Sequence, residues 1–141
     1  MTPQPNPVLL NVSVFPSDER TISVTPDVDY GGAHRYTFRN CLGFADGQTV
    51  YVDDANASGL DAMEAFQTIQ FVQKDNNGVV TPGLQSEQIV LALIDRQEKL
   101  NARFPSDQNE KALLGLRMFL DAQKERVMDR MGRGVMGNLK T

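Results

Sequence analysis

The sequence predicts an α+β protein, in which an antiparallel β-rich N-terminal half precedes an antiparallel two-helix hairpin. Two patterns indicate this. Residues 8–80 contain short runs rich in β-formers, partly alternating and separated by turn residues, which is typical of strands. Beyond Pro82-Gly83, apolar residues recur every three or four positions, which is typical of amphipathic helices. The 141 residues fit one domain, or one domain with a loose arm.

The β-rich half is expected to follow a flexible arm. Residues 1–7 carry three prolines at alternating positions, which favours an extended segment. Residues 8–80 then contain the expected strands, which are 8–15, 21–25, 34–40, 48–52 and 67–73, with a short helical stretch around 60–66. The first two strands read as a hairpin, and 75–78 is a turn signal. Since the connections are too short for crossover helices, the pairing should be antiparallel.

The C-terminal half, 81–141, is predicted to be a helical hairpin with a flexible tail. Ser86 is the expected N-cap of the first helix, which should end near Arg103, just before Phe104-Pro105. Asp107 is the expected cap of the second helix, because Glu110 follows at the spacing of a capping box.

The second helix has an apolar seam whose members are three or four residues apart: Leu113, Leu116, Leu120, Gln123, Val127 and Met131. Gly132, Gly134 and Gly137 end this helix. Two helices alone do not cover their own apolar faces. We therefore expect the stripes to pack on the β-rich half, on further copies of the chain, or on both.

Composition excludes several classes of function. No stretch approaches the roughly 20 apolar residues of a membrane helix, and the first residues do not resemble a signal peptide. A single Cys41 and a single His34 exclude an internal disulfide and a Cys/His metal cage within one chain, and suggest a reducing cytosol. The formal charge of −4 argues against DNA or RNA polymers. Residues 124–141 carry +3 and the remainder −7, which suits a compact phosphorylated ligand.

The motifs of common enzymes are missing, so we expect no catalysis and no cofactor. No nucleophile motif accompanies His34, and neither a phosphate loop nor a dinucleotide fingerprint is present. His34 is expected to be a packed or hydrogen-bonded strand residue, and Cys41 an inert, half-buried small hydrophobe rather than a redox thiol. Asp53-Asp54 reads as a solvated turn rather than a cation site.

Three arginines near the end of the second helix give the first positive signal. Arg126, Arg130 and Arg133 are spaced by four and three residues, so they project from one face, where their guanidiniums can bracket phosphates. The alternative is a solvated face paired with Glu125 and Asp129. Both readings remain open.

Two other groups suit parts of a nucleotide. The start of the first helix offers backbone N–H groups together with Gln85, Ser86 and Gln88, although ordinary capping is the alternative. Tyr36, Phe38 and Phe71 have faces for stacking on a base, although aromatic residues at strand positions are commonly core.

The chain resembles a family of small phage-encoded proteins, the Thoeris anti-defence and anti-CBASS cyclic-nucleotide sponges. The residues that carry the resemblance are His34-Arg-Tyr-Thr-Phe-Arg-Asn40, Thr68-Ile-Gln-Phe71, Gly83-Leu-Gln-Ser-Glu-Gln-Ile89, Ala92-Leu-Ile-Asp-Arg96, Glu125-Arg-Val-Met-Asp-Arg130 and Arg133-Gly-Val-Met-Gly137. It extends over about residues 34–137, is most convincing over 83–137, and is nearest to the Thoeris anti-defence type. The chain departs from the pattern by an insertion at 42–66 and an extra segment at 1–25.

The resemblance implies a phage protein of the host cytoplasm that sequesters cyclic ADP-ribose isomers or cyclic di- or trinucleotides without cleaving them. It implies a homo-oligomer, dimeric or hexameric, with ligands at subunit interfaces. The ligand-binding residues would then be Arg126, Arg130, Arg133, Gly134, Gln85, Ser86, Gln88, Phe71, Tyr36 and Asn40. The alternatives are a protein-interaction module without a nucleotide ligand and an enzyme that degrades the messenger.

Overall fold

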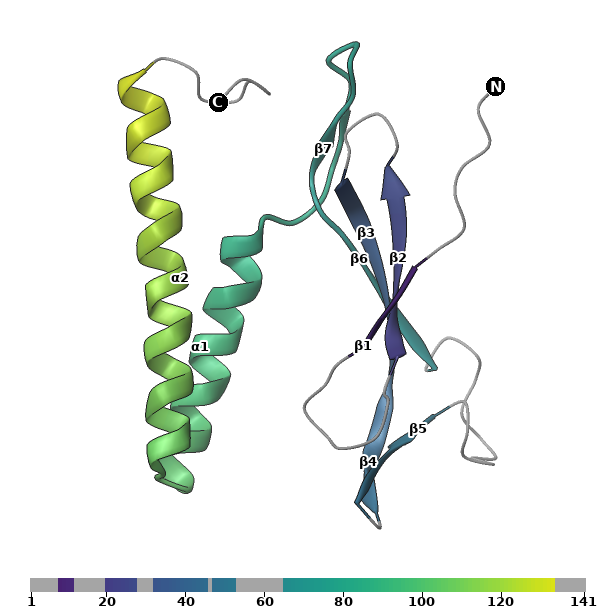
Figure 1. The fold of residues 1–141 in the computed structure, drawn as a ribbon, viewed down its shortest axis with the longest axis vertical. Helices are drawn as coiled ribbons and strands as arrows, with labels where there is room; N and C mark the ends of the chain where they lie inside the picture. Colours follow the sequence, from purple (N-terminus) through teal and green to yellow (C-terminus); the bar gives the residue numbers. More distant parts are fainter. Residues whose placement is uncertain (1–7, 12–19, 28–31, 46, 53–64, 134–141) are drawn as a thin grey trace. The chain divides into compact units, whose positions relative to one another are not determined.

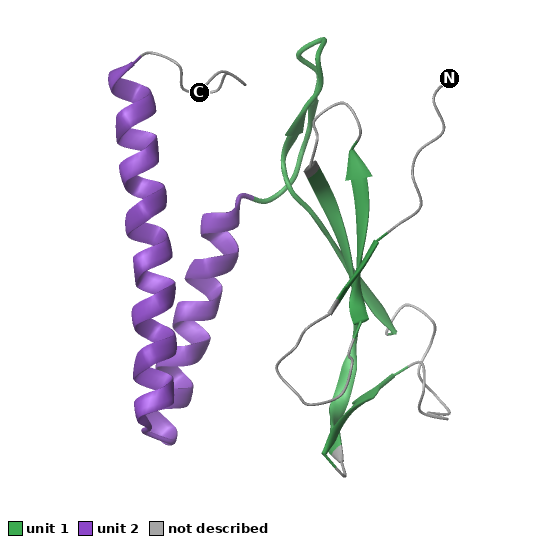
Figure 2. Cartoon of the chain, viewed as in Figure 1, with its two compact units in different colours: residues 1–84 green, residues 85–141 purple. Residues whose placement is uncertain are grey.

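The computed structural model describes residues 8–11, 20–27, 32–45, 47–52 and 65–133 (Figure 1). The chain divides into two units, Met1–Leu84 and Gln85–Thr141 (Figure 2), which are described separately below. The expected arm at 1–7, the tail at 134–141 and most of the expected helical stretch at 60–66 lie outside the described residues.

The α+β prediction is confirmed. The strands are β1 Val8–Asn11, β2 Arg20–Asp27, β3 Gly32–Arg39, β4 Cys41–Ala45, β5 Gln48–Tyr51, β6 Phe66–Gln70, β7 Gln73–Lys74 and β8 Val80–Thr81. The helices are α1 Ser86–Arg103 and α2 Asp107–Gly132. All strand pairs are antiparallel, as the short connections predict.

The largest sheet of the first unit has the strand order β1-β2-β3-β6. Its register places Val24, Tyr36 and Ile69 opposite one another on three successive strands, and all three are half-buried. The neighbouring residues Thr37 and Thr68 form a hydrogen bond between their hydroxyl groups, whose oxygens lie 3.1 Å apart. Apolar side chains on one face and hydroxyls on the other are what the alternation of a half-buried strand produces.

Two small hairpins complete the first unit. β4 and β5 form one, in which Gly47 takes a φ of 76°. β7 and β8 form the other, around the predicted turn at 75–78, where Gly78 has a φ of 81° and the Asp75 carboxylate accepts from the Asn77 and Val79 N–H groups. β4 was not predicted, since the sequence around it reads as an insertion rather than an alternating run.

The expected strand 67–73 is wrong in one respect, because it is interrupted at Phe71. There the chain meets Leu84 in a parallel bridge: the Leu84 N–H donates to the Gln70 carbonyl at 2.8 Å, and the Val72 N–H donates to the Leu84 carbonyl at 2.9 Å. A Cβ on Gly83 would lie 2.5 Å from the Gln70 oxygen and 2.6 Å from the Val72 nitrogen. Two backbones cross here, and only glycine leaves room for the crossing.

The helices of the second unit face each other along an antiparallel seam. The half-buried or buried positions are Glu87, Ile89, Val90, Ile94, Gln97 and Asn101 on α1, and Asn109, Leu113, Leu116, Leu120, Gln123, Val127 and Arg130 on α2. The last two continue the same side of α2 beyond the start of α1. Near the loop, hydrogen bonds join Gln97 to Asn109 and Asn101 to Glu110. The predicted seam is present, but Met131 is 61% exposed and Arg130 takes the inner position. The reason is the helical period of 3.6 residues: after Val127, the residue three positions on, Arg130, returns to the inner side, and not the residue four positions on, Met131.

Both predicted N-caps are wrong by one residue. Gln85 caps α1, and its N–H donates to the Gln88 side chain at 2.8 Å, so Ser86 is already helical. Ser106 caps α2, and its hydroxyl accepts from the Asn109 N–H at 3.0 Å. A serine hydroxyl is short enough to reach the third residue of the following turn, which makes Ser106 as good a cap as the predicted Asp107.

α2 is longer than α1. The helices have 26 and 18 residues, and they run antiparallel from a short loop, so the last eight residues of α2 extend past the start of α1 (Figure 1). At 1.5 Å per residue, this extension is about 12 Å of helix. We call these eight residues together with the C-cap Arg133, which is the range 125–133, the α2 extension.

The described side chains are only sparsely buried. Tyr51, Ala65, Val90 and Leu113 are the apolar residues that are buried, while many large apolar side chains are exposed, among them Leu91, Leu114, Met118 and Met128. Neither α1 nor α2 is long and apolar enough to cross a membrane.

Candidate functional site

The α2 extension carries all three arginines that the sequence singled out. Arg126 and Arg133 are exposed and Arg130 is half-buried. With 3.6 residues per turn, spacings of four and three place their Cα–Cβ bonds within an arc of about 60° around the helix axis. The helix therefore brings three guanidinium groups onto one side of its last two turns. Gly134, the fourth predicted residue here, lies outside the described residues.

The charge of this segment is positive despite two acidic neighbours. The α2 extension contains three basic side chains and two carboxylates, and Lys124 directly before it adds a fourth basic side chain. Arg133 donates to the Asp129 carboxylate at 2.8 Å, one helical turn earlier, and both side chains are largely exposed. Such a surface pair contributes little to stability, so a phosphate would displace the carboxylate at small cost. The solvated reading is thus realised for Arg133, without preventing anion binding.

At the start of α1, the capping reading is the one realised. The Gln88 side-chain oxygen accepts a hydrogen bond from the Gln85 N–H, and the Gln88 N–H donates to the Gln85 carbonyl at 3.1 Å. Ser86 is exposed and does not cap. An anion at this helix start would first have to displace the Gln88 side chain. Gln85 and Gln88 therefore form one structural unit rather than two separate ligand contacts.

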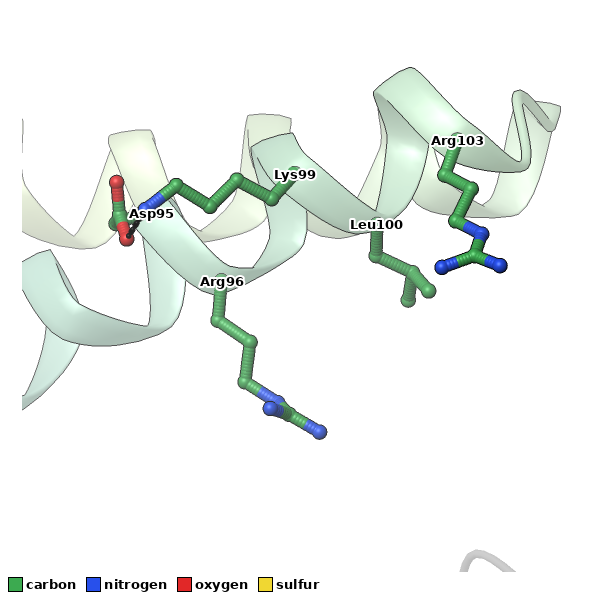
Figure 3. Close-up of a pocket in the computed structure, with 5 residues that line it drawn as sticks. All are labelled: Asp95, Arg96, Lys99, Leu100 and Arg103. Atoms are coloured by element: carbon green, nitrogen blue, oxygen red, sulfur yellow. Dashed lines mark hydrogen bonds and ion pairs between the residues drawn. The ribbon is translucent and has the colours of Figure 1, made fainter.

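A second cationic surface lies on α1, and sequence reasoning missed it. Asp95, Arg96, Lys99, Leu100 and Arg103 line a recess of about 430 Å³ (Figure 3). Figure 3 shows Arg96, Leu100 and Arg103 projecting from the same side of the helix, with Leu100 between the guanidiniums, while Lys99 turns toward Asp95. The spacing of seven residues between the two arginines was the available signal, since it returns to nearly the same face after two turns.

The Asp95–Lys99 pair is closed by a 2.8 Å contact. A hydrogen bond to Asp95, together with its charge, raises the pKa of Lys99 above its ordinary value of 10.5. Lys99 therefore pairs with a carboxylate of its own helix, in an exposed i,i+4 pair like Arg133–Asp129. Arg96 and Arg103 are the other two cations that line this recess.

In the first unit, two of the three predicted residues lie together. The rings of Tyr36 and Phe71 meet edge to face, with centroids 5.6 Å apart and planes at 89°. Both are half-buried, so this is a packing contact of core type. Asn40 follows the other end of β3, where its side-chain oxygen accepts from the Gln67 amide at 2.6 Å. The structure thus separates Asn40 from the aromatic pair.

The described part of the chain offers no metal centre. Within it, no group of three or more His, Cys, Asp or Glu side chains is placed to hold a metal ion. Cys41 is an exposed free thiol, so the expectation that it is half-buried is wrong.

Comparison of the chain with models of known protein families gives no match, and comparison with curated proteins gives none either.

Proposed function

We propose that the chain is an oligomeric binding protein that sequesters small cyclic nucleotide signals of the host cytoplasm without cleaving them. The observation that carries this proposal is the α2 extension, where Arg126, Arg130 and Arg133 occupy one side of the helix beyond the start of α1. Guanidinium groups bind phosphates through paired, charge-assisted hydrogen bonds. The resemblance of residues 83–137 to nucleotide sponges of phages supports the same ligand class.

The charge distribution favours a compact anion over a polymer. The unit Gln85–Thr141 contains ten basic and eight acidic side chains, whereas Met1–Leu84 contains four basic and ten acidic ones. A long polyanion needs a broad basic footprint from which counterions are released. A cationic helix end on a chain of net charge −4 is limited to ligands with a few phosphates.

Sequestration requires tight binding, and tight binding requires that the arginines be enclosed. A nanomolar dissociation constant corresponds to about −12 kcal/mol. Exposed ion pairs contribute only about 0–1 kcal/mol each, so arginines open to water do not reach this value. The proposal therefore includes association of copies, dimeric or hexameric, over the apolar side chains that α2 exposes, which are Leu114 at 59%, Met118 at 62% and Met128 at 63%.

Isothermal titration with cyclic ADP-ribose isomers and with cyclic di- and trinucleotides tests this function. We expect tight binding of at least one class, and recovery of the unaltered ligand after the complex is denatured. Flat titrations across all these classes would overturn the proposal. Recovery of a cleaved product would replace it by an enzyme that degrades the messenger.

A matched pair of charge reversals tests the site itself. Arg126→Glu places a carboxylate among the arginines and should weaken binding by at least 100-fold. Lys111→Glu makes the same charge change at an exposed position near the other end of α2 and should leave binding within about twofold. Equal losses in both variants would indicate a general charge effect rather than a site.

A protein-interaction module is the second candidate, and the exposed apolar side chains of both helices favour it. In that case the arginines bind no ligand and only keep this face of the helix in contact with water. An Arg130→Glu variant that folds, associates as the wild type does and still blocks anti-phage defence in an infection assay would support the module over the sponge.

A further inference from the structure

A polar pocket in the first unit belongs to none of the sites described above. It has a volume of about 370 Å³ and is lined by Thr25, Pro26, Asp27, His34, Arg35, Gln70 and Gln73. Four strands contribute to it, since β2, β3, β6 and β7 each supply at least one lining residue. Its size lies within the range of about 300–1,000 Å³ that small-molecule sites occupy.

The residues at the pocket are held in place by one another. The Gln73 amide donates to an oxygen of the Asp27 carboxylate at 2.7 Å, and His34 Nε2 lies 3.7 Å from the same oxygen. The side chains of His34 and Asp27 are only 13% and 23% exposed. The His34 backbone is fixed too, because its carbonyl accepts from the Phe71 N–H at 2.6 Å. Preorganised groups of this kind lower the entropic cost of ordering side chains when a ligand binds.

The charges of the lining determine which ligands fit. Asp27 disfavours an anion, and Arg35 disfavours a cation. The other polar lining groups are a hydroxyl, an imidazole and two carboxamides, which both donate and accept hydrogen bonds. An uncharged ligand with many hydroxyl groups satisfies most of this lining, whereas a zwitterion would use only Asp27 and Arg35.

We propose that this pocket binds a neutral, hydroxyl-rich ligand of nucleoside size, and that the Asp27 carboxylate accepts hydrogen bonds from two adjacent hydroxyls of its sugar ring. A carboxylate has about four acceptor positions, so it accepts hydrogen bonds from both hydroxyls of a vicinal diol while keeping its contact with Gln73. In dinucleotide-binding folds, an acidic side chain likewise accepts a hydrogen bond from the ribose 2′-hydroxyl.

Titration of the ¹⁵N-labelled full-length chain with adenosine, followed by NMR, tests the proposal. Adenosine should shift the amide signals of Thr25, Asp27, residues 34–35 and residues 70–73. The same titration with 2′,3′-dideoxyadenosine, which lacks the diol, should show binding at least tenfold weaker. Equal binding of the two nucleosides would overturn the role of the diol, and no shift at these residues with adenosine would overturn the pocket as a site.

Substitutions provide the second arm. Asp27→Asn keeps the shape of the side chain but removes its charge, and should weaken adenosine binding at least tenfold. Asp121→Asn, an equal change at an exposed position of α2, should leave it unchanged. Should Asp27→Asn lose the signal dispersion of a folded chain, the comparison of the two nucleosides with the wild type still decides the matter.

Two further ligands separate this pocket from its rivals. Glycine, a zwitterion, and inorganic phosphate should leave the same amide signals in place, and shifts with either would contradict a neutral ligand. Adenosine carries no phosphate, so it should leave the amide signals of residues 125–133 in place. The pocket and the proposed arginine site therefore succeed or fail independently.

Discussion

The helical unit and the β-rich unit differ in how directly their structure follows from neighbouring residues. α1 and α2 are joined by a short loop and face each other along one continuous seam. In the β-rich unit, β6 pairs with β3 although about thirty residues separate Thr37 from Thr68, and the described strands form three separate sheets. The comparison shows that the stability of a contact between helices adjacent in sequence depends mainly on individual buried side chains. The pairing of strands distant in sequence also requires that the backbone segments between them come close together.

The most damaging test of the seam is Leu113→Ala. Leu113 is 3% exposed at the centre of the helix pair, so truncation should cost about 2–5 kcal/mol of unfolding free energy, measured by chemical denaturation with helical circular dichroism. The adjacent Leu114, at 59% exposure, is the matched control, and Leu114→Ala should cost less than about 0.5 kcal/mol. Equal costs would mean that the seam is not the core of this unit.

In the β-rich unit, the corresponding test concerns a close approach of two backbone segments rather than a buried side chain. Gly83→Ala should destabilise the unit by about 1–3 kcal/mol, because the new Cβ meets the backbone of residues 70–72. Gly115→Ala adds the same methyl group within α2, where nothing lies within 4 Å, and should stabilise by up to about 1 kcal/mol. A harmless Gly83→Ala would show that the two backbones do not cross closely in solution.

A smaller effect is expected at the start of α2. Ser106→Ala removes the hydroxyl that accepts from the Asn109 N–H and should cost about 1 kcal/mol, measured by thermal unfolding. Ser86→Ala, within the first turn of α1 rather than at its cap, should cost nothing, since alanine is the better helix former. A larger loss of stability in Ser86→Ala than in Ser106→Ala would instead support the cap positions that the sequence predicts.

The smallest effect concerns a surface pair. Because Asp95 raises the pKa of Lys99, the folded ammonium keeps its proton to higher pH than the unfolded one does. The pair therefore stabilises the helix below the unfolded pKa, and this contribution is lost as the pH rises through the folded pKa. Titration of Lys99 by ¹³C NMR should show a lower pKa in Asp95→Asn. No change would mean that the pair does not form in solution.

Much of the fold could be predicted from the sequence because its signals are local. The apolar spacing along α2, the Phe104-Pro105 break and the turn at 75–78 each act on nearby residues. The caps were misplaced by one position because Gln85 and Ser106 depend on side-chain geometry that spacing alone does not reveal. The break at Phe71 was missed because its cause, Gly83, lies twelve residues away.

The candidate site was predicted in part for the same reason. Helical spacing brings Arg126, Arg130 and Arg133 together without any tertiary information. The polar pocket joins Asp27, His34 and Gln73, which are up to 46 residues apart and meet only through strand pairing. No pattern along the chain marks such a meeting, so His34 read as an ordinary strand residue.

The unequal lengths of α1 and α2 have a consequence for hydrogen exchange. Backbone N–H groups opposite α1 are released only when the helix pair opens, whereas those of the α2 extension are released when the end of α2 frays without α1 beside it. Exchange at 125–133 should therefore be faster than at 113–120 in the free chain. Slowing confined to 125–133 would then report an occupant of the arginines directly, without any change in the stability of the helix pair.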